Sequence, residues 1–185
     1  MSIPTGVRTK LEYDDLMHLP EDGNTYEILE GDLYVTPSPS PIHQRVSKRL
    51  QRQLEAYFEA TGLGEVFNAP LDVILSKGDV VEPDLIVVTD PAQVSNRAVE
   101  GPPLLLVEIL SPSSIERDRI LKAARYAALG VPHYWIVDLE ARVIECYRRI
   151  GTKYEPIARA QAPAALQHPD WPDLAIDTAT IWHRT

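Results

Sequence analysis

Val80-Val81-Glu82-Pro83-Asp84-Leu85-Ile86-Val87-Val88 is the first of two apolar stretches that decide the fold, and Leu104-Leu105-Leu106-Val107-Glu108-Ile109-Leu110 is the second. Such apolar, β-branched runs predict strands that are buried on both faces. A carboxylate inside a buried strand is costly unless it is paired or binds a cation. Asp84 and Glu108 therefore need an explanation. Each could be hydrogen-bonded at a strand end, or both could hold one divalent metal ion.

A helix expected after the second stretch supplies three further polar side chains. Asp118, Lys122 and Tyr126 recur every four residues, so they share one side of a helix over 118–129 that Gly130 closes. Alone, Asp118 and Lys122 would be interpreted as a surface ion pair; beside the two acids they favour a common site. Another buried strand over 133–138 follows, and a helix between two such strands predicts a right-handed crossover in a mixed sheet.

The remaining chain predicts elements around this centre. A capping box of Thr9 and Glu12 predicts a helix to about Met17, and alternation over 24–35 predicts a β-hairpin. Glu27 and Glu30 flank this hairpin, where we expect a solvated turn rather than metal ligands. Strands are expected over 65–68, 71–75, 142–148 and 154–158, and the tail is expected to be a loop with a short final helix. We expect one domain over 1–185, of the α/β (α+β) class.

The clearest helix begins with Ser40 as the N-cap and Pro41 at the first helical position. Its apolar residues recur every four positions and predict a buried face: Ile42, Val46, Leu50, Leu54 and Phe58. Gly62 suits its C-terminal cap. The opposite face is basic and amide-rich: Gln44, Arg45, Lys48, Arg49, Gln51 and Arg52. That face is either solvated or a ridge that meets phosphate.

Composition limits the function classes. The 185 residues carry a net charge of −9, which argues against a protein that coats nucleic acid generally, but not against a nuclease with a local basic patch. The single Cys146 cannot form an internal disulfide, which fits a reducing cytoplasm. We expect no membrane span and no signal peptide. The five histidines show no metal-ligand spacing; His43 alone is placed near the site, at the start of the long helix, where capping that helix is its favoured role.

A Pro-Asp at one strand and an acid on the next suit metal-dependent phosphodiester cleavage. Asp84 and Glu108 could hold Mg²⁺ or Mn²⁺, which prefer oxygen ligands, and the backbone carbonyl of Ile109 could complete the coordination. Such an ion polarises a phosphate and lowers the pKa of a bound water. A nearby lysine can orient that water or stabilise the developing negative charge.

The chain also resembles the PD-(D/E)XK nuclease superfamily and, within it, the Uma family of restriction endonucleases. The matching stretches run in order along nearly the whole chain: Tyr26–Val35, Ser38–His43, Glu82–Leu85, Val107–Pro112, the Asp118/Lys122/Tyr126 helix and Gly130–Asp138. The resemblance implies a restriction-endonuclease-like core, a mixed β-sheet flanked by helices. Asp84 would match the motif's first acid and Glu108 its second.

One departure concerns the motif's lysine, which the superfamily places two residues after the second acid. Leu110 occupies that position here. The resemblance suggests that Lys122 enters the same space from the helix, with Asp118 holding it and Tyr126 bracing it.

The sequence therefore predicts an endonuclease that uses Mg²⁺ or Mn²⁺ to hydrolyse phosphodiester bonds in DNA, with Asp84, Glu108 and Lys122 as catalytic residues. The alternative is a catalytically silent nuclease-like domain that serves as a binding or scaffold module. Leu110 and the negative charge favour that alternative. Folds of this type often dimerise to cut both strands, so a homodimer is a further expectation.

Overall fold

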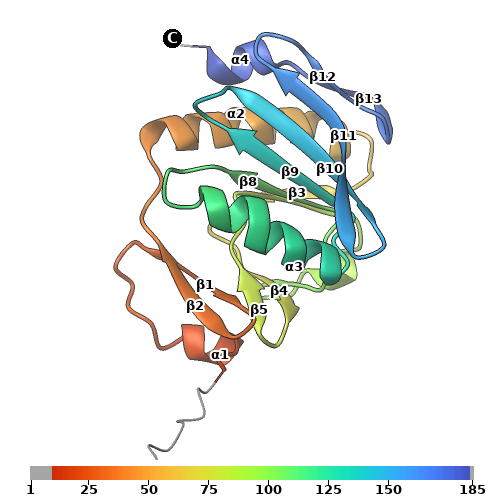
Figure 1. The fold of residues 1–185 in the computed structure, drawn as a ribbon. Helices are drawn as coiled ribbons and strands as arrows, with labels where there is room; N and C mark the ends of the chain where they lie inside the picture. The colour runs from red at the N-terminus through yellow and green to blue at the C-terminus, as the bar shows by residue number, and fades with distance from the viewer. Residues whose placement is uncertain (1–9, 184–185) are drawn as a thin grey trace, which may run out of the picture.

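The computed structural model describes residues 10–183 (Figure 1). Its helical segments are α1 (Tyr13–Leu16), α2 (Pro41–Phe58), the 3-10 turn η1 (Pro91–Gln93), the π-helical segment η2 (Arg117–Lys122), α3 (Ala123–Ala128) and α4 (Thr178–Trp182). Its strands are β1 (Thr25–Leu29), β2 (Asp32–Thr36), β3 (Glu65–Asn68), β4 (Val73–Ser76), β5 (Asp79–Val81), β6 (Leu85–Val88), β7 (Val99–Glu100), β8 (Leu105–Ile109), β9 (His133–Asp138), β10 (Val143–Ile150), β11 (Lys153–Gln161), β12 (Leu166–His168) and β13 (Trp171–Ile176).

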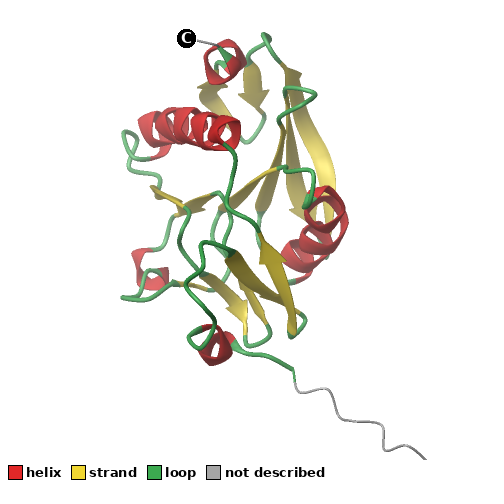
Figure 2. Cartoon of the chain, turned by 90° about the vertical axis from the view of Figure 1, so that its left-hand side faces the viewer, coloured by secondary structure: helices red, strands yellow, loops and turns green. Residues whose placement is uncertain are grey.

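Two larger sheets and a C-terminal hairpin organise these strands. The six-stranded sheet has the order β11-β10-β9-β8-β6-β3, and the five-stranded sheet has the order β2-β1-β5-β4-β7. β8 and β9 are parallel, and the other neighbours in the six-stranded sheet are antiparallel. In Figure 2, α2 covers one face of the six-stranded sheet and α3 covers the other. The predicted mixed sheet flanked by helices is confirmed.

Side-chain alternation along β8 divides the interior into two apolar clusters. Leu105 and Val107 pack in the cluster that contains the buried residues of α2, whereas Leu106 packs in the cluster that contains Tyr126 of α3. Because successive strand residues point to opposite faces, Glu108 shares its face with Leu106 and points toward the helix after β8. The strand pattern thus aims this acid at Lys122 and Tyr126.

The expectation that the first apolar stretch forms a single strand is wrong. β5 ends at Val81 in the five-stranded sheet, and β6 begins at Leu85 in the six-stranded sheet. Pro83 lies between them, and proline has no N–H to donate to a central ladder. The segment 82–84 therefore crosses from one sheet to the other, which leaves Asp84 at the entrance to β6.

α2 begins as predicted. The Ser40 side chain accepts a hydrogen bond from the His43 backbone N–H, 3.3 Å away, and Pro41 is the first helical residue. The helix ends at Phe58, and Gly62 follows with a left-handed φ of 69°. The expected buried face is wrong at Ile42, which is 46% exposed, because His43 and Ser47 take the buried positions in the first turns.

No helix within 10–183 is long and apolar enough to span a membrane.

The structure differs from the prediction near both ends of the described chain, in the N-cap of the first helix and in the tail. Thr9 lies outside the described residues; the first helix has Glu12 as its N-cap, with Asp15 completing a capping box, and it ends at Leu16 with Met17 as its C-cap, close to the predicted end. The tail, expected as a loop with a helix, contains the β12–β13 hairpin before α4. The hairpin packs against the sheet through Leu166 and other buried side chains of the α2 cluster.

The corrected face of α2 can be tested with a matched pair of variants. Leu50→Ala removes a fully buried side chain and should lower the free energy of unfolding by about 2–5 kcal/mol. Ile42→Ala should change it by no more than about 0.5 kcal/mol, because Ile42 is half exposed. Urea denaturation measures both; equal losses would mean that Ile42 belongs to the core.

Candidate active site

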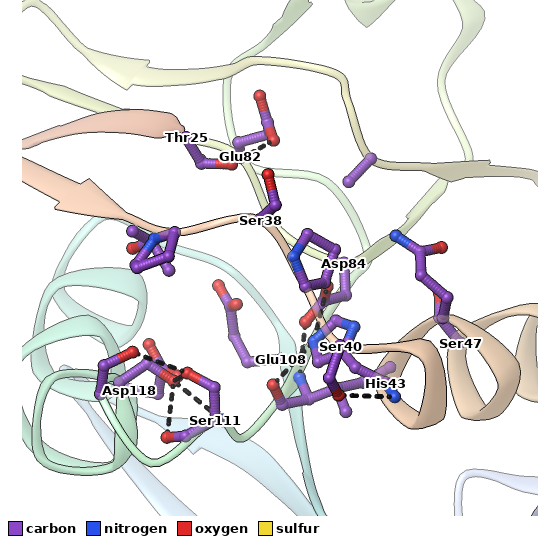
Figure 3. Close-up of a pocket in the computed structure, with 18 of the residues that line it drawn as sticks. Thr25, Ser38, Ser40, His43, Ser47, Glu82, Asp84, Glu108, Ser111 and Asp118 are labelled. Atoms are coloured by element: carbon purple, nitrogen blue, oxygen red, sulfur yellow. Dashed lines mark hydrogen bonds and ion pairs between the residues drawn. The ribbon is translucent and has the colours of Figure 1, made fainter. Parts of the chain in front are cut away.

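A cleft of about 820 Å³ opens where the two sheets, the start of α2 and the π-helical segment meet (Figure 3). The crossing segment with Asp84 and the C-terminal end of β8 form its floor. Six of the sequence-predicted residues line it: Asp84, Glu108, Ile109, Asp118, Lys122 and His43. Tyr126 is fully buried behind them in α3. The fold thus brings side chains from across the chain into one cavity.

Asp84 is fixed to the end of β8 through its carboxylate. Oδ2 accepts a hydrogen bond from the Ile109 backbone N–H at 2.7 Å, and Oδ1 lies 3.2 Å from Nε2 of His43. The same Nε2 lies 3.1 Å from the carbonyl oxygen of Ile109. Two oxygens, one from Asp84 and one from Ile109, therefore converge on one point.

That point favours positive charge. Burial lowers the pKa of His43, but the hydrogen bond and charge of Asp84 and the Ile109 carbonyl outweigh burial, so the pKa is raised above its ordinary value. The Nε2–H of His43 donates toward both oxygens, and these oxygens attract positive charge.

Lys122 lies deep in the cleft and is 2% exposed, so the interpretation of a surface ion pair is wrong. Its Nζ lies 2.7 Å from Glu27 Oε1, 2.9 Å from Glu108 Oε1 and 3.6 Å from Asp118 Oδ1. Burial would lower the pKa of Lys122, yet the charges of Glu108, Glu27 and Asp118 raise it above its usual value. The side chain is therefore an ammonium surrounded by acids.

Glu108 receives two hydrogen bonds at the same oxygen. Lys122 donates to Oε1 at 2.9 Å and the Tyr126 hydroxyl donates to it at 2.7 Å, so Tyr126 contacts the acid rather than the lysine. Neither of these two bonds uses Oε2. Burial raises the pKa of the Glu108 carboxyl well above its usual range, and the charges of Asp118 and Glu27 add to this, while Lys122 opposes it. Additional positive charge in the cleft would favour the ionised form.

Glu27 is a site residue that the sequence interpretation missed. It was expected at a solvated turn, but it is 2% exposed, and its Oε1 also accepts the Glu82 backbone N–H at 3.0 Å. An available signal was that Glu27 stands between Tyr26 and Ile28 in a strand, the same pattern of an acid within apolar neighbours that singled out Asp84. Glu30, in contrast, is exposed in the turn and pairs with Arg125 at 3.0 Å.

A π-helical segment places Asp118 and Lys122. The Asp118 N–H donates to the Ser114 carbonyl at 2.8 Å, and the Tyr134 hydroxyl donates to the Asp118 carbonyl at 3.0 Å. Both side chains turn into the cleft, while Ile120 in the same segment is 65% exposed. π-helical turns inside helices are rare and frequently occur at functional sites.

Comparison with known proteins identifies a family and a structure of similar fold. The family described as "Uma2: Putative restriction endonuclease" matches residues 12–179. The chain belongs to the Uma2 family. A crystal structure from Anabaena variabilis, titled as that of a putative nuclease belonging to DUF820, is 17% identical, with a TM-score of 0.73 over 92% of this chain and 97% of that one. This likeness shows a shared fold. A search of curated proteins finds no match.

The charge cluster of this Uma2 protein yields a stability prediction. Lys122→Met should lower the free energy of unfolding by about 3–5 kcal/mol at pH 7, because it leaves buried carboxylates without their cation. Adding Glu108→Gln should restore part of this loss. Lys48→Met, at an exposed cleft residue, is the control and should cost no more than about 0.5 kcal/mol.

The same variant should depend on pH in a defined direction. Without Lys122, the folded-state pKa of Glu108 rises further above its unfolded value, so protonation stabilises the fold. The deficit of Lys122→Met against wild type should therefore shrink as pH falls from 7 to 5. Urea denaturation at each pH measures it, and a deficit that grows on acidification would contradict the buried-cluster account.

Proposed function

We propose that this Uma2 protein is an endonuclease that hydrolyses phosphodiester bonds in DNA with the help of a divalent metal ion bound in the cleft. The observation that carries the proposal is the convergence of an Asp84 oxygen and the Ile109 carbonyl on one point in a cleft that also contains Glu108 and Lys122. Membership in a family described as a restriction endonuclease and a nuclease-titled structural neighbour support it.

The donor set fits Mg²⁺ or Mn²⁺. Asp84, Glu108 and the Ile109 carbonyl offer oxygen ligands, which hard divalent ions prefer. A bound ion would polarise the scissile phosphate and lower the pKa of a water molecule. The Nε2 of His43 contacts two of these oxygens, so the His43 ring competes with a cation for them.

The protein's own residues position the reaction. Oδ2 of Asp84 stays anchored by the Ile109 N–H, which fixes the direction of Oδ1. Lys122, held by Glu27 and Asp118, supplies positive charge from the helix and can stabilise negative charge that develops on a phosphate oxygen. Leu110, at the motif's usual lysine position, is buried in the apolar cluster that contains Tyr126.

A second candidate is a silent nuclease-like domain that binds nucleic acid without cutting it. One observation favours it: Lys122 is 2% exposed and is paired with acids in the cleft. For catalysis, the ammonium must reach a substrate oxygen from this enclosed position.

Cleavage assays separate the two candidates. Wild-type protein should cut single- or double-stranded DNA with Mg²⁺ or Mn²⁺ and stop on addition of EDTA. Asp84→Asn and Glu108→Gln should each lower the rate by at least about 100-fold, the size of loss expected when one group that stabilises the transition state is removed. Asp90→Asn, an exposed acid outside the cleft lining, is the matched control and should keep full activity.

Two results would contradict the proposal. Full activity in both Asp84→Asn and Glu108→Gln would exclude the metal site. If the protein binds DNA but does not cleave it in the presence of Mg²⁺ or Mn²⁺, the silent binding module would be favoured.

The basic face of α2 divides into separate roles. Lys48 lines the cleft with the amide residues Gln44 and Gln51, where it can meet a backbone phosphate. Arg49 instead donates to the Ile181 carbonyl at 3.1 Å and anchors the C-terminal helix. Arg45 is exposed outside the cleft lining.

This division predicts a change in salt dependence. Lys48→Gln should weaken DNA binding and reduce the slope of log affinity against log salt by about 0.9, the value for one lost phosphate contact on duplex DNA. Arg159→Gln, an exposed arginine on β11, should leave the slope unchanged. Fluorescence anisotropy of labelled DNA over a salt series measures both, and equal slopes for Lys48→Gln and wild type would mean that Lys48 is merely solvated.

A further inference from the structure

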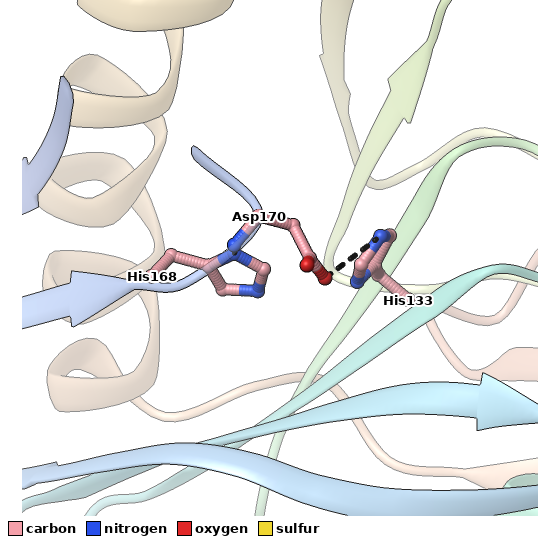
Figure 4. Close-up of side chains that lie close together, drawn as sticks. All are labelled: His133, His168 and Asp170. Carbon is pink, nitrogen blue, oxygen red and sulfur yellow. Dashed lines mark hydrogen bonds and ion pairs between the residues drawn. The ribbon is translucent and has the colours of Figure 1, made fainter. Parts of the chain in front are cut away.

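A second group of potential metal ligands lies outside the cleft. His133 is the first residue of β9, His168 is the last residue of β12, and Asp170 lies in the turn before β13 (Figure 4). One ligand atom from each residue lies within 4.8 Å of the other two. Docking of the C-terminal hairpin on the central sheet brings them together.

This group lies at the opposite end of β8 and β9 from the cleft. His133 pairs with Leu105 at the start of β8, whereas Glu108 and Ile109 stand at its end. Three to four strand residues separate the two places, which is about 10–13 Å. An ion held by the histidines would therefore be separate from one held by Asp84.

Both imidazole rings are buried and incompletely satisfied. His133 is 7% exposed and His168 is 1% exposed, and Nε2 of His168 has no hydrogen-bond partner; in His133 the nitrogen without a partner is Nδ1, whereas Nε2 faces Asp170. Buried polar atoms without partners are uncommon in folded proteins and call for an explanation such as a bound ion.

The ring of His168 makes one long hydrogen bond. The Asp170 backbone N–H donates to its Nδ1 over 3.3 Å. A neutral imidazole has one nitrogen that can accept, so the ring must release this bond when it binds a cation. At this length the bond is weak, and its loss costs little.

The protonation state of the two imidazole rings suits a cation. Burial, with a smaller contribution from His133, lowers the pKa of His168 to about 4, and burial lowers the pKa of His133 despite the nearby Asp170. Neutral rings offer a lone pair at pH 7 without competition from protons.

Arg148 orients the carboxylate of the group. Its Nη1 donates to Oδ1 of Asp170 at 2.7 Å, and Oδ2 of Asp170 lies 3.9 Å from Nε2 of His133. The carboxylate thus turns one oxygen toward the arginine and the other toward the ring. Arg148 also weakens the attraction for a cation, so we expect a site of moderate affinity.

We propose that His133, His168 and Asp170 bind one divalent transition-metal ion, Zn²⁺ or Co²⁺, that fastens the C-terminal hairpin to the central sheet. Two imidazoles and one carboxylate suit these ions rather than Mg²⁺. Typical metal–ligand distances of about 2.0–2.2 Å require the three side chains to draw together slightly, which the partly exposed Asp170 can accommodate. The role is structural, because the ion would join β9 to the β12–β13 turn.

Titration in an Asp84→Asn background tests the site while removing one of the proposed metal ligands of the cleft. EDTA-treated protein should bind one equivalent of Zn²⁺ or Co²⁺ by isothermal titration calorimetry, and its melting temperature should rise with either ion but not with Mg²⁺. Adding Asp170→Asn or His168→Gln should weaken binding at least tenfold and abolish the rise. Adding His18→Gln, an exposed histidine elsewhere, should change neither result.

Asp170→Asn decides the matter if His168→Gln fails to fold, because Asp170 is partly exposed and its replacement leaves both rings in place. Equal Zn²⁺ affinity with and without Asp170→Asn, or no saturable binding in the parent, would overturn the proposal. Because Asp84 is already replaced, these outcomes do not depend on whether the protein cleaves DNA.

Discussion

The ammonium of Lys122, buried between Glu27 and Glu108, is the interaction on which the architecture of the cleft depends. Glu27 belongs to the five-stranded sheet, Glu108 to the six-stranded sheet, and Lys122 to the helical segment that covers the second of these. One side chain thus joins three parts of the fold at the place where the cleft opens. Without it, two buried carboxylates would repel each other across the junction of the sheets.

A buried cluster of charges is expected to add little to the net stability of the fold. Buried ion pairs often contribute little net stability, since desolvation of the charges offsets their attraction. Strained or charged active sites commonly cost stability that a purely apolar packing would not. The concentration of acids in one cleft, with Asp84 and the Ile109 carbonyl beside them, is therefore better explained by cation and phosphate chemistry than by stability.

Much of the fold could be predicted because the apolar patterns are local, as in α2 and the buried strand β8. The stretch 80–88 is not one strand because Glu82, Pro83 and Asp84 interrupt its apolar residues, and Pro83 has no N–H to donate to a central ladder. The position of Glu27 between Tyr26 and Ile28 indicates that its side chain is buried, but its contact with Lys122, 95 positions away, is not visible in any local pattern. His133 and His168 likewise meet only after the tail docks, so their spacing in the sequence carries no ligand signature.

We propose that Asp84, Glu108 and the Ile109 carbonyl form a divalent-metal site beside Lys122. The most direct measurement is a crystal structure of the protein soaked in Mn²⁺, with anomalous diffraction recorded at the manganese absorption edge. We expect an anomalous peak within bonding distance of the Asp84 carboxylate and the Ile109 carbonyl, with Glu108 turned toward it. A map without a peak there, with His43 still bridging the two oxygens at saturating Mn²⁺, would contradict it.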